Sequence, residues 1–284
     1  MIRMLVTRPE PDASETAGRL RALGIEAIVQ PLLIAETLRT TLPPADGFAA
    51  LAVTSANALR ALHDRGELHV HMNGAVPVST IREIMADETT SLPAGFDFER
   101  DMTRLVPCKS LAEYLTPWQV LRLFPKKRAN LDRLAHAVFA SLAENAVRFV
   151  ELRSSVLYLT GLQSCTPAQA LERLIESTGS ASQQYGIRRG LILTVTRGDY
   201  GASNLATLLQ AYEDIGWPKD VVGLDLAGDE ETPYSAELPA MIREAKDRYG
   251  FGITIHAGET GRVESVRAAV ELFQADRIGH GTAA

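Results

Sequence analysis

This sequence of 284 residues has few cysteines, only short apolar runs and no excess of basic residues. The two cysteines, Cys108 and Cys165, are isolated and form no CxxC pair, which argues against a disulfide framework and a thiolate zinc site. The longest apolar runs, such as Phe48 to Val53, are too short to span a bilayer, and the N-terminus lacks the apolar segment of a signal peptide. We therefore expect a cytoplasmic protein with no membrane partner.

The charge balance is acidic, with 35 Asp and Glu residues against 29 Lys and Arg residues and a formal charge of −6. A protein that binds a nucleic-acid backbone normally has the opposite balance or a dense basic patch. The basic cluster Lys126 to Arg128 is explained by a solvated helix start. We expect no nucleic-acid partner. The apolar content of 46% excludes a disordered chain, because enough apolar surface is available to bury.

Short apolar strands alternate with longer amphipathic helices, which is the pattern of parallel α/β folds. In the first quarter, strands are predicted at 4–7, 26–34 and 48–54, and helices at 12–23 and 55–64. After a strand at 67–71 and a long helical region, strands recur at 147–155, 190–197, 221–228, 251–259 and 277–283. These later strands are almost continuously apolar and end in polar or Gly residues, so we expect function at their carboxyl ends. The domain boundary is placed near residues 63–66, which gives domains 1–65 and 66–284.

Four of the six histidines fall at predicted strand ends. His69 and His71 stand two residues apart on a strand, so both side chains point to one face and can form half of a metal site. His256 ends an apolar strand and is followed by Glu259, a carboxylate suited to metal-assisted hydrolysis. His280 stands between two glycines where the last strand ends.

Simpler interpretations of these signals stay open on the residues alone. His69 and His71 could lie on a solvated strand face, and Glu259 could be an acidic residue at a helix start. The other two histidines, His63 and His136, are predicted to be structural or exposed.

The segment 225–230 ends a further apolar strand. Within it, Gly228 offers an exposed backbone N–H to a ligand. Asp229 and Glu230 could be taken for metal ligands, but we expect them to cap the next element or to face solvent.

Together, the motifs from Glu67 onward resemble the adenosine deaminase family almost throughout. They follow the order typical of that family: His69 to Gly74, Val150 to Arg153, Asp225 to Glu230, His256 to Glu259, and Arg277 to Gly281. The resemblance implies a (β/α)8-type barrel with one catalytic zinc (Zn²⁺). Its partner would be a small-molecule purine nucleoside, with adenosine hydrolysed at the 6-amino group to inosine and ammonia. The other zinc deaminase class carries an HxE…PCxxC signature, which is absent here.

The resemblance also implies roles for individual residues. The implied zinc ligands are His69, His71 and His256. Glu259 would protonate purine N1, and His280 would orient or deprotonate the attacking water. Gly228 would donate its backbone N–H to purine N3, and Asn73 and His71 would face the substrate. Protonation of N1 offsets the negative charge that develops as water adds to C6.

Two features depart from the family's pattern. Many members have an Asp two residues beyond the second histidine, where it contacts ribose, and Asn73 stands at that position. The family also continues to a pair of adjacent aspartates on a later strand, whereas this sequence ends at Ala284 with about six of eight barrel strands. The alternative is therefore a catalytically impaired or inactive deaminase-like fusion protein that lacks the last metal-ligand aspartate. An open barrel edge would also favour self-association.

Residues 1 to about 62 carry a second resemblance, in segments 5–24 and 53–62, to the beginning of a uroporphyrinogen-III synthase. The fragment is too short to form the two-domain cleft of that family, so we do not predict that activity. Because it supplies parallel strand and helix units, it could pack on the barrel or complete it.

Overall fold

A computed structural model describes residues 3–6, 12–22, 24–29, 65–103 and 108–282. The chain divides into two compact units, residues 1–65 and 66–284. The first unit contains β1 (Arg3–Val6), α1 (Asp12–Ala22) and β2 (Glu26–Val29). The strand predicted at 48–54, the helix predicted at 55–64 and His63 lie outside the described residues.

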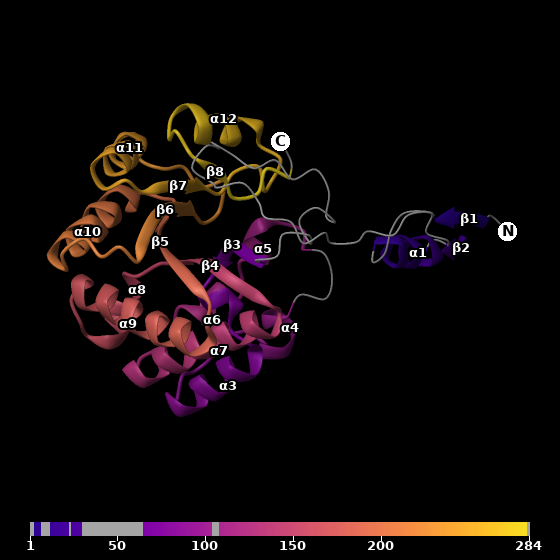
Figure 1. The fold of residues 1–284 in the computed structure, drawn as a ribbon, viewed down its shortest axis with the longest axis horizontal. Helices are drawn as coiled ribbons and strands as arrows, with labels where there is room; N and C mark the ends of the chain where they lie inside the picture. Colours follow the sequence, from indigo (N-terminus) through magenta and orange to yellow (C-terminus); the bar gives the residue numbers. More distant parts are fainter. Residues whose placement is uncertain (1–2, 7–11, 23, 30–64, 104–107, 283–284) are drawn as a thin grey trace. The chain divides into compact units, whose positions relative to one another are not determined.

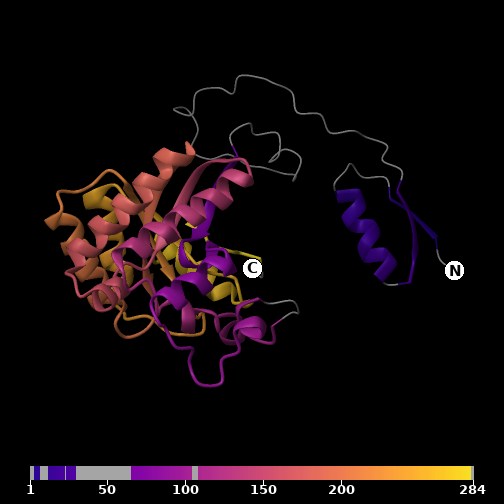
Figure 2. The same ribbon diagram turned by 90° about the horizontal axis from the view of Figure 1, so that it is seen from below.

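In the first unit, residues 3–29 form a small parallel β–α–β arrangement. β1 and β2 pair in parallel, and α1 lies against them (Figure 2). The buried contact is made by small side chains, Ala13 and Ala17 of α1 and Ala27 of β2. Gly24 follows α1 at a φ of +74°, a backbone conformation that favours glycine after a helix. The resemblance of this unit to a uroporphyrinogen-III synthase stays a prediction.

The second unit is a curled sheet of six strands in the order β3-β4-β5-β6-β7-β8, so each strand neighbours the next one along the chain. The strands are β3 (Arg65–His71), β4 (Val147–Ser154), β5 (Arg188–Thr196), β6 (Val221–Ala227), β7 (Gly252–Ile255) and β8 (Arg277–Ile278). Strands β4 to β8 pair in parallel. The predicted α/β barrel-type architecture is confirmed in the form of a half-barrel.

Helices connect the strands, and the longer ones lie on the outer side of the curled sheet (Figure 1). Between β3 and β4 they are η2 (Asn73–Ala75, a 3-10 turn), α3 (Val78–Asp87), α4 (Phe98–Met102), α5 (Leu111–Tyr114), α6 (Trp118–Leu121) and α7 (Arg128–Glu144). The later helices are α8 (Tyr158–Gln163), α9 (Pro167–Tyr185), α10 (Gly201–Asp214), α11 (Leu238–Tyr249) and α12 (Val263–Glu271). None of the helices in the described part of the chain has both the length and the apolar character that a membrane span needs.

Local sequence explains why these elements begin and end where they do. Before α9, the Thr166 hydroxyl accepts from the Gln169 N–H and the Gln169 side chain accepts from the Thr166 N–H, with Pro167 at the first helical position. The same helix ends at Gly186, whose φ is +64°. The central strands are apolar on both faces because helices cover one face and the strands enclose the other; Leu193 of β5 is fully buried.

The curl of the sheet brings distant strands together. Arg277 of β8 donates to the carboxylate of Glu151 of β4, although three strands lie between them in the sheet. The rings of His69, on β3, and His280, after β8, have centroids 5.1 Å apart. The two outermost strands of the sheet therefore converge at their carboxyl ends, where the predicted site residues lie.

Candidate metal centre and active site

Three imidazoles converge at the carboxyl ends of β3 and β7. The Nε2 atom of His256 lies 3.1 Å from Nε2 of His69 and 3.0 Å from Nε2 of His71. One ligand nitrogen from each ring falls within 4.8 Å of the other two. Alternation along β3 places His69 and His71 on one face of the strand, and the curl of the sheet brings His256 to them.

A buried carboxylate orients one of these rings. Oδ1 of Asp225, in the middle of β6, lies 2.9 Å from Nδ1 of His256, and the Asp225 side chain is fully buried. This contact leaves Nε2 of His256 directed toward His69 and His71. A carboxylate on the far nitrogen is the usual way in which a metal-binding imidazole is fixed in one tautomer.

A buried arginine completes the interior of the site. Arg153, from β4, donates to the carbonyl of Leu68 at 2.9 Å and lies 3.5 Å from Oδ1 of Asp225. Its NH1 atom is also 3.4 Å from Nδ1 of His69. The arginine is 1% exposed, and its charge is balanced by Asp225.

The surroundings keep two of the histidines neutral. Burial and the positive charge of Arg153 lower the pKa of His69 to about 3. Burial and the neighbouring His256 lower the pKa of His71 to about 4. A neutral imidazole is the form that binds a metal ion, so the two rings are ready to act as ligands at neutral pH.

Glu259 and His280 lie beside the three imidazoles. Oε2 of Glu259 is 3.5 Å from Nε2 of His280, and the His280 ring centroid is 5.2 Å from that of His256. Glycines make this proximity feasible: a Cβ atom on Gly279 would lie 3.2 Å from both His256 Cα and His69 Cε1. The structure thus brings together the five residues predicted for metal binding and acid–base chemistry.

Gly228 and Asn73 lie at the ends of β6 and β3, respectively. Gly228 has a φ of +100°, and a Cβ atom there would lie 3.0 Å from Thr196 Cγ2, so glycine is favoured both by conformation and by space. The Asn73 amide group is held by the protein itself. Its Nδ2 donates to the Leu121 carbonyl at 3.0 Å, and the hydroxyl of Tyr158 donates to its Oδ1 at 3.1 Å.

One expectation from the sequence is wrong. Glu230 neither caps the next element nor faces solvent: it is 5% exposed, and its carboxylate accepts hydrogen bonds from the backbone of Gly258, Glu259 and Thr260. Asp229, next to it, accepts from the N–H of Glu231. The role of Glu230 depends on a turn 28 residues further along the chain, so local sequence carried no signal for it.

Asp225 and Arg153 stand in motifs that the sequence analysis quoted, but no role was given to them. A signal was available for Asp225, because it is a charged residue inside an otherwise apolar strand, whereas Arg153 shares β4 with Arg148 and Glu151. A buried charge must be paired, so a cationic partner for Asp225 in the interior of the barrel could have been predicted.

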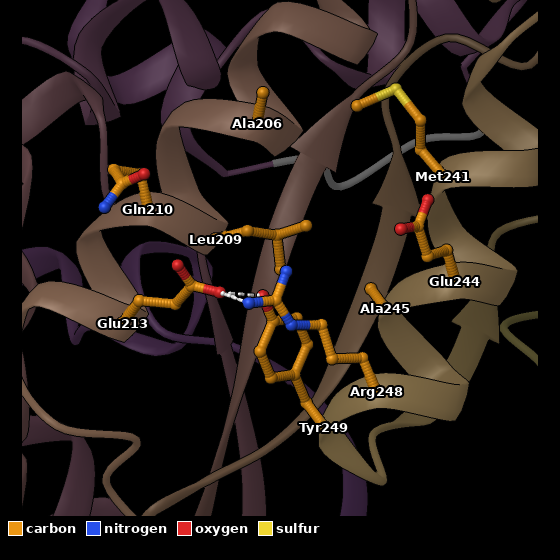
Figure 3. A pocket seen from close by; sticks show the side chains of 9 residues that line it. All are labelled: Ala206, Leu209, Gln210, Glu213, Met241, Glu244, Ala245, Arg248 and Tyr249. Atoms are coloured by element: carbon orange, nitrogen blue, oxygen red, sulfur yellow. Dashed lines mark hydrogen bonds and ion pairs between the residues drawn. The ribbon is translucent and has the colours of Figure 1, made fainter.

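A pocket between α10 and α11 lies away from this centre, on outer helices (Figure 3). There Arg248 and Tyr249 of α11 both donate to the carboxylate of Glu213 on α10. Burial and the Glu213 carboxylate raise the pKa of Tyr249 to about 12, so its hydroxyl stays a donor at neutral pH. These contacts join two neighbouring helices, and the pocket contains no predicted site residue.

The protein has a curled parallel sheet, with imidazoles that converge at the carboxyl ends of its strands. These features place it among α/β-barrel proteins that have a candidate metal centre. The family model for adenosine deaminase matches residues 65–284. The chain therefore belongs to the adenosine deaminase family. An adenosine deaminase of Clostridium botulinum is 32% identical over 217 residues, which are 76% of this chain and 64% of that relative. These likenesses do not favour the predicted alternative of an inactive protein.

Solved structures share the fold. An amidohydrolase from Burkholderia ambifaria with bound zinc matches with a TM-score of 0.66 at 22% identity, covering 82% of this chain and 63% of that chain. The Arabidopsis protein ADAL in complex with GMP matches with a TM-score of 0.60 at 23% identity, covering 76% and 64%. In these comparisons the chain spans about 64% of the length of its relatives.

Proposed function

We propose that the chain hydrolytically deaminates a 6-aminopurine nucleoside, converting adenosine to inosine and ammonia with the help of one zinc ion. The observation that carries the proposal is the convergence of three histidine nitrogens next to Glu259 and His280. Membership of the adenosine deaminase family supports the same reaction.

The donor set suits zinc. Zinc–imidazole bonds of about 2.0–2.1 Å in a tetrahedron place ligand nitrogens roughly 3.3 Å apart, and His256 Nε2 lies 3.0–3.1 Å from the other two Nε2 atoms. His69, His71 and His256 would hold the ion. When bound, zinc supplies Lewis-acid activation of a water molecule.

The remaining steps belong to side chains and backbone of this chain. Water adds to purine C6 while the Glu259 carboxyl gives a proton to N1, so the ring never carries the full negative charge. His280, 3.5 Å from Glu259, orients the water and accepts its proton. The added hydroxyl then gives its proton to the Glu259 carboxylate and becomes the C6 carbonyl as the C–N bond breaks. The amino group takes the proton held by His280 and leaves as ammonia. The Gly228 N–H would hold purine N3 during these steps.

The choice among 6-aminopurines depends on the region around Asn73. Both ends of its amide already bond Leu121 and Tyr158, so Asn73 would present a neutral, fixed surface to the sugar side of a substrate. A neutral residue at this position does not repel a phosphate as a carboxylate would. Adenosine is the proposed substrate, and adenosine monophosphate and adenine are the comparison substrates.

The first test is turnover of adenosine by the zinc-loaded chain, followed by the ultraviolet change from amino- to oxopurine. We expect turnover that a chelator removes and zinc restores. Glu259→Gln should lower kcat by at least about 10²-fold, because the acid is lost, while bound zinc measured by atomic absorption stays the same.

The outcome that contradicts the proposal is a folded, zinc-loaded chain that deaminates none of the three purines. Turnover of the nucleotide but not of adenosine would keep the reaction and replace the substrate. Turnover that survives Glu259→Gln would remove Glu259 from its proposed role.

A further inference from the structure

The carboxylate of Glu230 binds three consecutive backbone N–H groups. Its Oε1 accepts from Gly258 at 2.6 Å, and its Oε2 accepts from Glu259 at 3.0 Å and from Thr260 at 2.7 Å. The Thr260 hydroxyl donates to Oε2 as well, at 2.9 Å. This turn follows β7 and carries the proposed catalytic acid, Glu259.

The carboxylate is ionised in this setting. Burial alone would raise the pKa of Glu230, but the nearby Ser265 hydroxyl and hydrogen bonds from Thr260 and Gly258 outweigh burial and lower it to about 2. A charged acceptor makes stronger hydrogen bonds than a neutral one, so the turn is held firmly.

The other end of the same segment is held by a cation. NH2 of Arg197, which follows β5, donates to the backbone carbonyl of His256 at 2.7 Å. The five residues from His256 to Thr260 therefore contact an arginine at one end and a carboxylate at the other. His256 and Glu259 are contacted through their main-chain atoms, so their side chains stay available for the site.

We infer that Glu230 is a positioning residue, an inference that rests on the proposed function. Glu230 fixes the backbone of Glu259 so that the Glu259 carboxyl reaches the purine ring. Glu259 bonds Glu230 through its N–H, and its side chain extends toward His280. Both oxygens of Glu230 are already used by residues 258–260, which leaves it neither a metal ligand nor an acid in the reaction.

The substitution Glu230→Gln tests this role. It keeps the volume of the side chain but replaces one acceptor oxygen with an NH2 donor that faces backbone N–H groups. We expect amide hydrogen exchange in the peptide 257–261 to rise by about tenfold or more, with the other strands unchanged. We also expect kcat to fall by about 10²-fold while KM changes little, because misplacement of the acid affects the transition state more than binding.

Two variants serve as controls. Glu271→Gln makes the same chemical change at an exposed residue at the end of α12, and Leu205→Ala removes buried volume from α10 away from the site. Both should keep kcat within about threefold of the unsubstituted chain when measured well below their unfolding temperatures. Leu205→Ala shows how far a general loss of stability lowers kcat when the turn at residues 258–260 stays fixed.

Two outcomes would overturn the inference. One is unchanged exchange in peptide 257–261 of Glu230→Gln. The other is increased exchange with a kcat no lower than that of Leu205→Ala, which would make the contact purely structural. If the unsubstituted chain deaminates no purine, the proposed function fails, and the exchange comparison alone decides whether Glu230 holds the turn.

Discussion

At the scale of single residues, the low pKa of His71 predicts a pH-dependent stability. The pKa is about 4 in the folded, metal-free protein and ordinarily 6.5. Between these values the unfolded chain binds more protons than the folded one, so acid favours unfolding. The contribution of neutral His71 to the free energy of unfolding is fully present above pH 6.5. It falls as the pH drops toward 4, and at pH 5 it is lower by about 2 kcal/mol.

The measurement is the free energy of unfolding in urea at pH 7 and pH 5, with a chelator present. His71→Gln should reduce the difference between the two pH values by that amount. His136→Gln, on the outer helix α7, controls for the loss of a histidine elsewhere. Equal pH dependence in His71→Gln and the unsubstituted chain would contradict the prediction.

Residue types at strand ends were enough to predict which imidazoles the fold brings together. His69 and His71 stand two residues apart on one face of a strand, and His256 and His280 follow strands that the apolar pattern made visible. The interior contacts could not be predicted in the same way. Whether Asp225 faces His256 depends on the register between β6 and β7, and the Glu230 contacts depend on the path of a turn far along the chain.

At the scale of elements, the approach of the β8 turn to the histidines predicts the effect of a single methyl group. A Cβ atom on Gly279 would lie 3.2 Å from His69 Cε1 and 3.3 Å from His256 Nδ1. The backbone of Gly279 has no positive φ, so Gly279→Ala adds volume without a conformational penalty. We expect the imidazoles to be displaced and zinc affinity to fall by about tenfold.

Zinc affinity would be measured by competition with a chromogenic chelator. Gly161→Ala in α8 is the matched control, because a Cβ atom there meets no atom within 4 Å. The same zinc affinity in Gly279→Ala, Gly161→Ala and the unsubstituted chain would show that the turn tolerates the methyl group.

The elements themselves were predictable because strands of a parallel sheet are buried on both faces and therefore almost continuously apolar. The curl of the six-stranded sheet was harder to predict from the sequence. The contact between Glu151 and Arg277 joins β4 to β8, and it arises from the summed twist of the intervening strands, which no single strand's sequence contains.

At the scale of the whole molecule, each compact unit has its own core. The buried cluster of the first unit consists of Ala13, Ala17 and Ala27, and that of the second lies within residues 72–273. We expect a chain that begins at residue 65 to unfold cooperatively and to bind one zinc ion per molecule, as measured by urea denaturation and metal analysis. Loss of zinc binding on this deletion would instead favour the hypothesis that residues 1–65 complete the barrel.

The main-chain hold on the turn at residues 258–260 has a practical consequence. Because Glu230 accepts hydrogen bonds from backbone N–H groups and not from the Glu259 side chain, Glu259→Gln should leave the path of the backbone unchanged. Such a variant would bind an aminopurine in the unchanged site without converting it. Crystals soaked with each candidate nucleoside or nucleotide would then display which groups surround the sugar, before any product forms.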